Sequence, residues 1–143
     1  MGRLTRAQRI RKRPDFVRIQ DGGVRVSTRH YLWLLAAGTD AQGLARLGVV
    51  ASRKVGGAIE RNRAKRVLRE VFRHNTSLFA NGLDVVVIIR SGAHLLSFQQ
   101  AQAELQAMAS LIRRRGEDAL RAAHSAAATA VPPGAPRSDL ARR

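Results

Sequence analysis

The sequence of 143 residues contains no cysteine, so disulfide bonds and thiolate chemistry are excluded and a reducing compartment is permitted. No apolar run approaches the roughly 20 residues that a membrane-spanning helix needs. The longest run, near Val85–Ile89, has the length of a strand. Hydrophobic residues nevertheless make up 45% of the chain, which is enough to bury a core. We therefore expect a cytoplasmic protein with one ordinary packed domain.

Acidic residues are also scarce. Asp and Glu number 10 against 26 Lys and Arg, which gives a formal net charge of +16. A chain this basic repels itself, and a polyanion relieves that repulsion. Nucleic acid is the first candidate partner and an anionic membrane surface the second. No membrane partner is expected, because the sequence has no lipid anchor and its basic helix carries only core-type residues on the apolar side. Most of the cations are Arg, whose planar fork suits phosphate and can stack on bases.

The few acids are scattered singly up to Glu117-Asp118, whereas two-metal phosphodiester hydrolysis needs clustered carboxylates. The histidines show no ligand spacing and are His30, His74, His94 and His124. We therefore expect no catalytic residue, no metal site and no small-molecule substrate site in the protein itself.

Hydrophobic periodicity and turn residues predict the order α-β-β-β-α-β-α. The predicted helices are Pro14–Gln20, Ala58–Asn75 and a segment from the capping residue Ser97 to about Arg115. The predicted strands are Val24–Ser27, His30–Ala37, Arg46–Ala51 and Asp84–Ile89. This order suggests an α+β fold in which helices pack on one four-stranded sheet. Residues 1–13 are interpreted as a basic arm that orders against RNA, 14–115 as the domain, and 116–143 as a disordered Ala/Pro-rich tail with residual helix near Asp118–Ala123.

The stretch Lys54–Glu70, KVGGAIERNRAKRVLRE, combines many cations with regularly spaced apolar residues. On a helical wheel the apolar stripe consists of Ala64, Val67, Leu68, Val71 and Phe72. The opposite side carries Asn62, Lys65, Arg66, Arg69 and Arg73. Solvated helix faces normally mix charges of both signs, because opposite charges at i, i+4 stabilise a helix. This segregated basic face is therefore interpreted as a binding surface for a polyanion.

The residues just before this helix strengthen that interpretation. Arg53 and Lys54 follow the third strand, and Gly56-Gly57 lets the backbone pass close to a partner. A helix N-terminus presents unpaired N–H groups and a partial positive charge. We therefore expect the strand end and the helix start to form one electropositive corner.

The segment RLGVVASRKVGGAIERNRAKRVLRE resembles the signature of bacterial ribonuclease P protein subunits, whose hallmark Arg-Asn-Arg motif is Arg61-Asn62-Arg63 here. RIRKRPDFVRI is similar to the N-terminal pattern of that family, and GLDVVVIIR followed by LSFQQAQAELQ is similar to its last strand and helix. The resemblance covers roughly Arg9–Arg115. Gly57 stands where the family usually has Asn, and Gln20 where many members carry an aromatic residue.

The resemblance implies a fold like the second domain of ribosomal protein S5, with a left-handed β-α-β crossover around the Arg-Asn-Arg helix. It also implies that a large RNA subunit with Mg²⁺ cleaves the 5′ leader from precursor tRNA, while the small protein assists. Mg²⁺ would then act through the RNA subunit, and the partners would be that RNA and precursor tRNA. The alternative is a ribosomal or assembly RNA-binding protein of the same fold with no part in an enzyme.

Two sets of residues follow from the resemblance. The Arg-Asn-Arg helix is expected to contact phosphates of the RNA subunit. The full set expected to bind RNA, either the RNA subunit or tRNA, is Arg53, Lys54, Arg61, Asn62, Arg63, Lys65, Arg66, Arg69 and Arg73. The set expected to line a cleft for the single-stranded leader is Phe16, Tyr31, Trp33, Arg9, Arg11 and Lys12. Aromatic rings in such a cleft would stack on bases. Tyr31 and Trp33 lie on the same side of their strand, and that side is either the cleft or the core.

Overall fold

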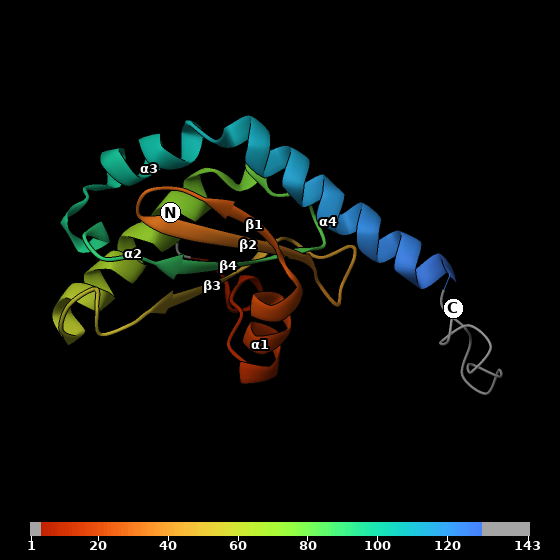
Figure 1. Cartoon of the computed structure of the whole chain (residues 1–143), viewed down its shortest axis with the longest axis horizontal. Helices are drawn as coiled ribbons and strands as arrows, with labels where there is room; N and C mark the ends of the chain where they lie inside the picture. Colours follow the sequence, from red (N-terminus) through yellow and green to blue (C-terminus); the bar gives the residue numbers. More distant parts are fainter. Residues whose placement is uncertain (1–3, 130–143) are drawn as a thin grey trace.

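The computed structural model describes residues 4–129, and Figure 1 shows their arrangement. The helices are α1 (Arg13–Gly22), α2 (Ala58–His74), α3 (Phe98–Gln106) and α4 (Ala109–Thr129), with short 3₁₀ turns η1 (Arg6–Gln8), η2 (Thr76–Leu78) and η3 (Ala93–Leu95). The strands are β1 (Val24–Ser27), β2 (Tyr31–Ala37), β3 (Arg46–Ala51) and β4 (Leu83–Ile89). They form one sheet in the order β1-β2-β4-β3. The predicted α+β fold is confirmed.

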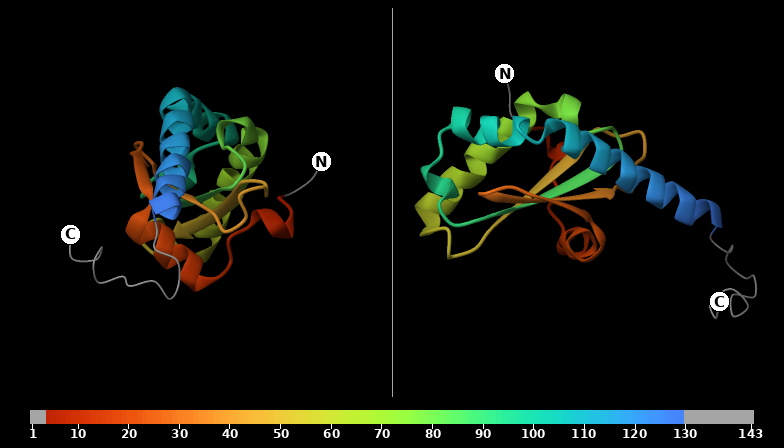
Figure 2. Two further views of the ribbon diagram at one scale, coloured as in Figure 1. Left: turned by 90° about the vertical axis from the view of Figure 1, so that its right-hand side faces the viewer. Right: turned by 45° about the horizontal axis from the view of Figure 1, so that its top comes forward.

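Both faces of the sheet are covered. Helix α1 packs on one face, and α2, α3 and α4 pack on the other (Figures 1 and 2). Because side chains alternate along a strand, β2 sends Trp33 and Leu35 into the larger core under three helices and Leu34 into the smaller core under α1. This double coverage explains the continuous apolar run of β4.

The chain runs from β3 through α2 into β4, and the two strands pair in parallel. The other pairs, β1 with β2 and β2 with β4, are antiparallel. A parallel pair needs a crossover connection, and α2 supplies it here. That this crossover is left-handed stays a prediction from the resemblance.

The C-terminal part of the chain differs from the prediction. Ser97 caps α3 as predicted, since its Oγ accepts a hydrogen bond from the N–H of Gln100 at 3.1 Å. The predicted single helix is instead two helices, which meet at Ala107 and Met108. The prediction of a disordered tail is wrong for residues 116–129, because α4 continues beyond the residual helix expected near Asp118–Ala123 and buries Gly116 and Ala119. Alanine is the best helix former, and small side chains let α4 approach the sheet closely. Residues 130–143 of the predicted tail lie outside the described residues.

The predicted basic arm is partly built into the domain. Ile10 is buried, and its N–H donates to the carbonyl oxygen of Leu47 on the edge strand β3 at 2.9 Å. Arg9 forms an isolated parallel bridge with the same residue, and Leu4 joins the larger core. The arm prediction is therefore wrong for residues 4–13, which pack without RNA because their apolar residues add to both cores. Residues 1–3 lie outside the described residues.

Candidate RNA-binding surface

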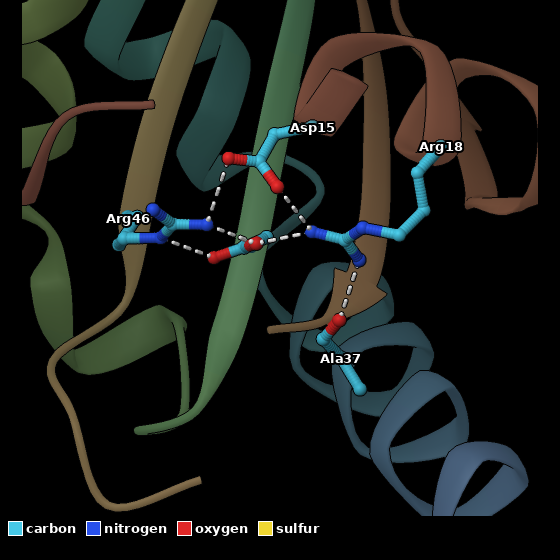
Figure 3. A network of polar contacts seen from close by, with 5 residues as sticks. Asp15, Arg18, Ala37 and Arg46 are labelled. Carbon is cyan, nitrogen blue, oxygen red and sulfur yellow. Dashed lines mark hydrogen bonds and ion pairs between the residues drawn. The ribbon is translucent and has the colours of Figure 1, made fainter. Parts of the chain in front are cut away.

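A buried carboxylate ties α1 to the sheet. Asp84 on β4 is 1% exposed and accepts two hydrogen bonds from Arg46 of β3, at 2.8 and 2.7 Å. Arg18 of α1 donates to the same carboxylate at 2.8 Å and to the carbonyl oxygen of Ala37 at 2.8 Å. Asp15 lies between the two arginines and pairs with both (Figure 3). Since charge-assisted hydrogen bonds are directional, this network fixes the position of α1 on its face of the sheet.

The network places the ring of Phe16 directly on β3. A Cβ atom at Gly48 would lie 2.6 Å from Cε1 of Phe16 and 3.1 Å from Cβ of Ile10. Glycine at this position is therefore what allows the ring to lie against the strand backbone. Phe16 is only partly buried.

Beside this ring is a hollow of about 410 Å³, here called the α1–β3 hollow. Its lining consists of Arg11, Arg13, Phe16, Gln20, Val49, Val50, Ala51 and Lys65. An aromatic ring surrounded by cations is the combination that single-stranded nucleic acid binding uses, with stacking for bases and positive charge for the backbone. The structure thus brings together two members of the predicted cleft set, Phe16 and Arg11. It adds Arg13, Gln20 and Lys65, which the prediction did not place there.

Tyr31 and Trp33 do not belong to this hollow, so their assignment to the leader cleft is wrong. They are 1% and 0% exposed and face the larger core on the opposite side of the sheet. The Trp33 ring stacks on Phe79 with centroids 5.9 Å apart, and burial raises the pKa of Tyr31. The physical reason is that helices cover the face to which both rings point, and a covered face cannot receive RNA.

The other two members of the cleft set also lie elsewhere. Lys12 is exposed at the N-cap of α1, outside the lining of the α1–β3 hollow. Arg9 lies in a second hollow, together with Arg66 and Arg69 of α2. The predicted cleft set is therefore split between two places on the surface.

The basic face of α2 is present as predicted. Ala64, Leu68, Val71 and Phe72 are buried, which leaves Asn62 and Arg66 exposed and Lys65 and Arg69 partly exposed. In the described residues, the side chains of Lys65, Arg66 and Arg69 form no hydrogen bond or ion pair with the protein. They are available for phosphate groups.

The two arginines of the Arg-Asn-Arg motif are engaged differently. Arg61 donates from Nη1 to the carbonyl oxygen of Gly56 at 3.0 Å, which closes the turn before α2. Arg63 donates from Nε to the carbonyl oxygen of His94 at 3.1 Å and from Nη2 to that of Leu96 at 3.5 Å. Each guanidinium has five N–H groups, so donors remain for a ligand. Both side chains nevertheless hold the start of α2 against neighbouring loops.

The electropositive corner at the start of α2 is also formed. Arg53 and Lys54 are exposed in the turn between β3 and α2, and Ser91 Oγ donates to the carbonyl oxygen of Lys54 at 3.1 Å. Gly56 in this turn has φ of +151°, a conformation that other residues rarely adopt. The turn that presents the two cations therefore depends on a glycine.

Arg73, at the end of α2, differs from the rest of the predicted set. Its Nη2 lies 2.7 Å from Oε1 of Glu70, and the hydrogen bond from Arg73 lowers the pKa of that carboxyl. A carboxylate thus balances the charge of Arg73. Its predicted contact with RNA stays a prediction, with less physical support than for the three unpaired cations of the helix.

Within residues 4–129, no three His, Cys, Asp or Glu side chains gather in a way that could hold a metal ion. Across the same residues, no helix is both long and apolar enough to cross a membrane.

Comparison with known proteins gives the family. Residues 4–113 match the family described as Ribonuclease P. The chain belongs to this family. The ribonuclease P protein component of Geobacter sp. (strain M21) is 38% identical over 112 residues, which span 77% of this chain and 92% of that protein. The component from Desulfatibacillum aliphaticivorans is 41% identical over 87 residues, which span 60% and 71% of the two chains.

Solved structures agree with the fold. The ribonuclease P protein of Staphylococcus aureus superimposes with a TM-score of 0.65 at 32% identity, covering 74% of this chain and 95% of that one. The protein of Thermotoga maritima gives a TM-score of 0.62 at 32% identity, covering 74% and 96%. The chain is thus a ribonuclease P protein component by family, and the family match ends at Arg113, inside α4.

Proposed function

We propose that the protein binds the catalytic RNA subunit of ribonuclease P and the 5′ leader of precursor tRNA, and so assists removal of the leader. The observation that carries the proposal is the unpaired basic face of α2 in a chain of this family. Contacts between Arg or Lys and phosphate supply affinity without reading sequence. The proposed set for the RNA subunit is Arg53, Lys54, Arg61, Asn62, Arg63, Lys65, Arg66 and Arg69.

The leader is assigned to the α1–β3 hollow. Phe16 offers a ring on which a base can stack, and Arg11 and Arg13 offer charge for the backbone. Gln20 offers an amide rather than a ring at this site, so stacking rests on Phe16 alone. The two proposed surfaces adjoin at Lys65, which belongs to α2 and also lines the hollow.

The protein supplies no catalytic group in this proposal. Mg²⁺ would be held by the RNA subunit and by phosphates, and the enzyme would work in the cytoplasm where precursor tRNA is processed. A ribosomal or assembly RNA-binding protein would share the charge and the fold, but the family match favours ribonuclease P over it.

Salt-dependent binding tests the proposal. The affinity for a bacterial ribonuclease P RNA should fall linearly with the logarithm of salt concentration, and the double variant Lys65→Ala/Arg66→Ala should reduce the slope by about two units. The matched control is Arg113→Ala/Arg114→Ala, which removes two exposed cations from α4 and should leave the slope almost unchanged. Equal losses in both variants would show that the α2 face has no special role.

A further inference from the structure

A second basic hollow, of about 460 Å³, lies between the N-terminal segment and α2. Its lining consists of Leu4, Arg9, Arg66, Arg69 and Glu70. We call it the arginine pocket. None of its residues lines the α1–β3 hollow, so the two are separate.

Backbone contacts bring the three arginines together. Arg9 is held by its bridge to Leu47 on β3 and by the adjacent hydrogen bond from Ile10. Arg66 and Arg69 are three residues apart on α2, and side chains at this spacing lie on the same face of a helix. The pocket is thus assembled from two segments that are distant in sequence.

The positive charge of the pocket is not balanced by the protein. Within the described residues, the side chains of Arg9, Arg66 and Arg69 have no hydrogen-bond or ion-pair partner, and Nε of Arg9 is buried without an acceptor. Glu70, the acid in the lining, is paired with Arg73. Burial lowers the pKa of Arg69, and repulsion from Arg9 and Arg66 lowers it further.

Two other arginines of this chain lie close together but have a carboxylate as their partner. Arg18 and Arg46 also converge, but the buried carboxylate of Asp84 lies between them. Converging cations that no carboxylate pairs with are unfavourable in the free protein, because each repels the others and Arg69 is partly desolvated. An anion supplied from outside would remove this repulsion.

The chemistry of the pocket selects the anion. Guanidinium groups match the oxygens of a phosphate with paired N–H donors, and three of them can surround one group. The lining contains an aliphatic side chain but no aromatic ring, so it lacks the kind of stacking surface that Phe16 gives the α1–β3 hollow. We propose that Arg9, Arg66 and Arg69 together bind one backbone phosphate of the ribonuclease P RNA subunit. This inference rests on the proposed function and moves Arg9 from the leader to the RNA subunit.

A double-mutant cycle tests whether the three side chains share one phosphate. Arg9→Ala and Arg69→Ala should each weaken binding to the RNA subunit by on the order of tenfold, because each removes charge-assisted hydrogen bonds. The double variant should lose clearly less than the product of the two factors, since both act on the same group. The control pair is Arg9→Ala with Lys65→Ala, whose effects should multiply, because Lys65 faces the other hollow. Thermal unfolding of each variant verifies that it is folded.

A second readout separates this inference from the proposed function. Inorganic phosphate added to the free protein should shift the Nε–Hε resonances of Arg9 and Arg66, and Arg69→Ala should abolish the shifts. If the wild type bound no ribonuclease P RNA, the proposed function would fail even with these shifts present. If RNA bound but the losses for Arg9 and Arg69 multiplied, the shared phosphate would be refuted. Phosphate shifts together with multiplying losses would mark a site for free anions only, which also overturns the inference.

Discussion

Arg63 on α2 donates a hydrogen bond from Nε to the carbonyl oxygen of His94 at 3.1 Å, across the loop that follows β4. Arg61 also donates to a backbone carbonyl, that of Gly56, so both arginines of the Arg-Asn-Arg motif are hydrogen-bonded within their own protein. The motif both orients the start of α2 and contributes charge to the surface. Loss of RNA binding in an Arg63 variant would combine the two effects.

Stability measurements separate them. Arg63→Ala should lower the free energy of unfolding by about 1 kcal/mol, because two carbonyl groups lose a charged donor at an exposed site. Arg66→Ala, which removes no hydrogen bond or ion pair within the described residues, should stay within about 0.5 kcal/mol of the wild type. Urea unfolding measures both. Equal stabilities of the two variants would show that the Arg63 contacts do not hold the loop.

The close contact between Phe16 and Gly48 gives a second prediction. Gly48→Ala places a Cβ 2.6 Å from the Phe16 ring, and such overpacking should cost about 1–3 kcal/mol. Displacement of the ring should also weaken binding of precursor tRNA with a leader more than binding of mature tRNA. The control is Gly22→Ala, where a Cβ would meet nothing within 4 Å. Unchanged leader discrimination in a folded Gly48→Ala protein would exclude Phe16 from the leader site.

The hydrogen-bond network around Asp84 gives a third prediction. Asp84→Asn removes the negative charge between Arg18 and Arg46 and should lower the free energy of unfolding by about 3 kcal/mol. This value is at the low end for breaking a buried ion pair, because both arginines keep contact with water. The exposed Asp21 of α1 supplies the control, and Asp21→Asn should be nearly neutral. A small effect of Asp84→Asn on thermal unfolding would mean that apolar packing alone positions α1.

The hydrogen bonds of Glu104 lead us to predict that the stability of the protein depends on pH. Burial alone would raise its pKa, but hydrogen bonds from Thr28 Oγ1 at 2.5 Å and from the N–H of His30 at 2.7 Å outweigh burial and lower the pKa. A carboxyl with a lowered pKa in the folded state stabilises the protein above its unfolded pKa of about 4.3. That contribution is lost as pH falls through the folded value.

The variant Glu104→Gln isolates this contribution. The difference in unfolding free energy between wild type and variant should be largest near neutral pH and should shrink below about pH 4. Urea titrations over this range measure it. A difference that stays constant with pH would show that the contacts do not depend on the charge of Glu104.

The sequence predicted the strands closely because their apolar runs and turn residues are strong local signals. For the second half of α4 it predicted only residual helix near Asp118–Ala123, because a helix whose inner face is made of alanine and glycine, such as Gly116 and Ala119, lacks a large-residue periodicity. It left Tyr31 and Trp33 open between cleft and core. The alternation of side chains along a strand shows that the two rings lie on the same side of the sheet. Only the placement of the helices shows which side of the sheet is covered.

In the candidate site, too, local patterns predicted some features, and other features depend on contacts between distant segments. The basic face of α2 follows from helical periodicity, so the exposure of Arg66 was predictable. The placement of Arg9 beside that helix depends on the register of the N-terminal segment against Leu47 of β3, which no local pattern encodes. The same holds for the Arg63 contact, which joins residues 31 positions apart.

The most direct test of the account is the rate of leader removal by a bacterial ribonuclease P RNA at low Mg²⁺, measured with and without the purified protein. We expect the wild type to raise the rate, and we expect Lys65→Ala/Arg66→Ala, as stable as the wild type, to lose most of the increase. The protein alone should give no cleavage. No increase with the wild type, or an undiminished increase with the double variant, would contradict the central claim.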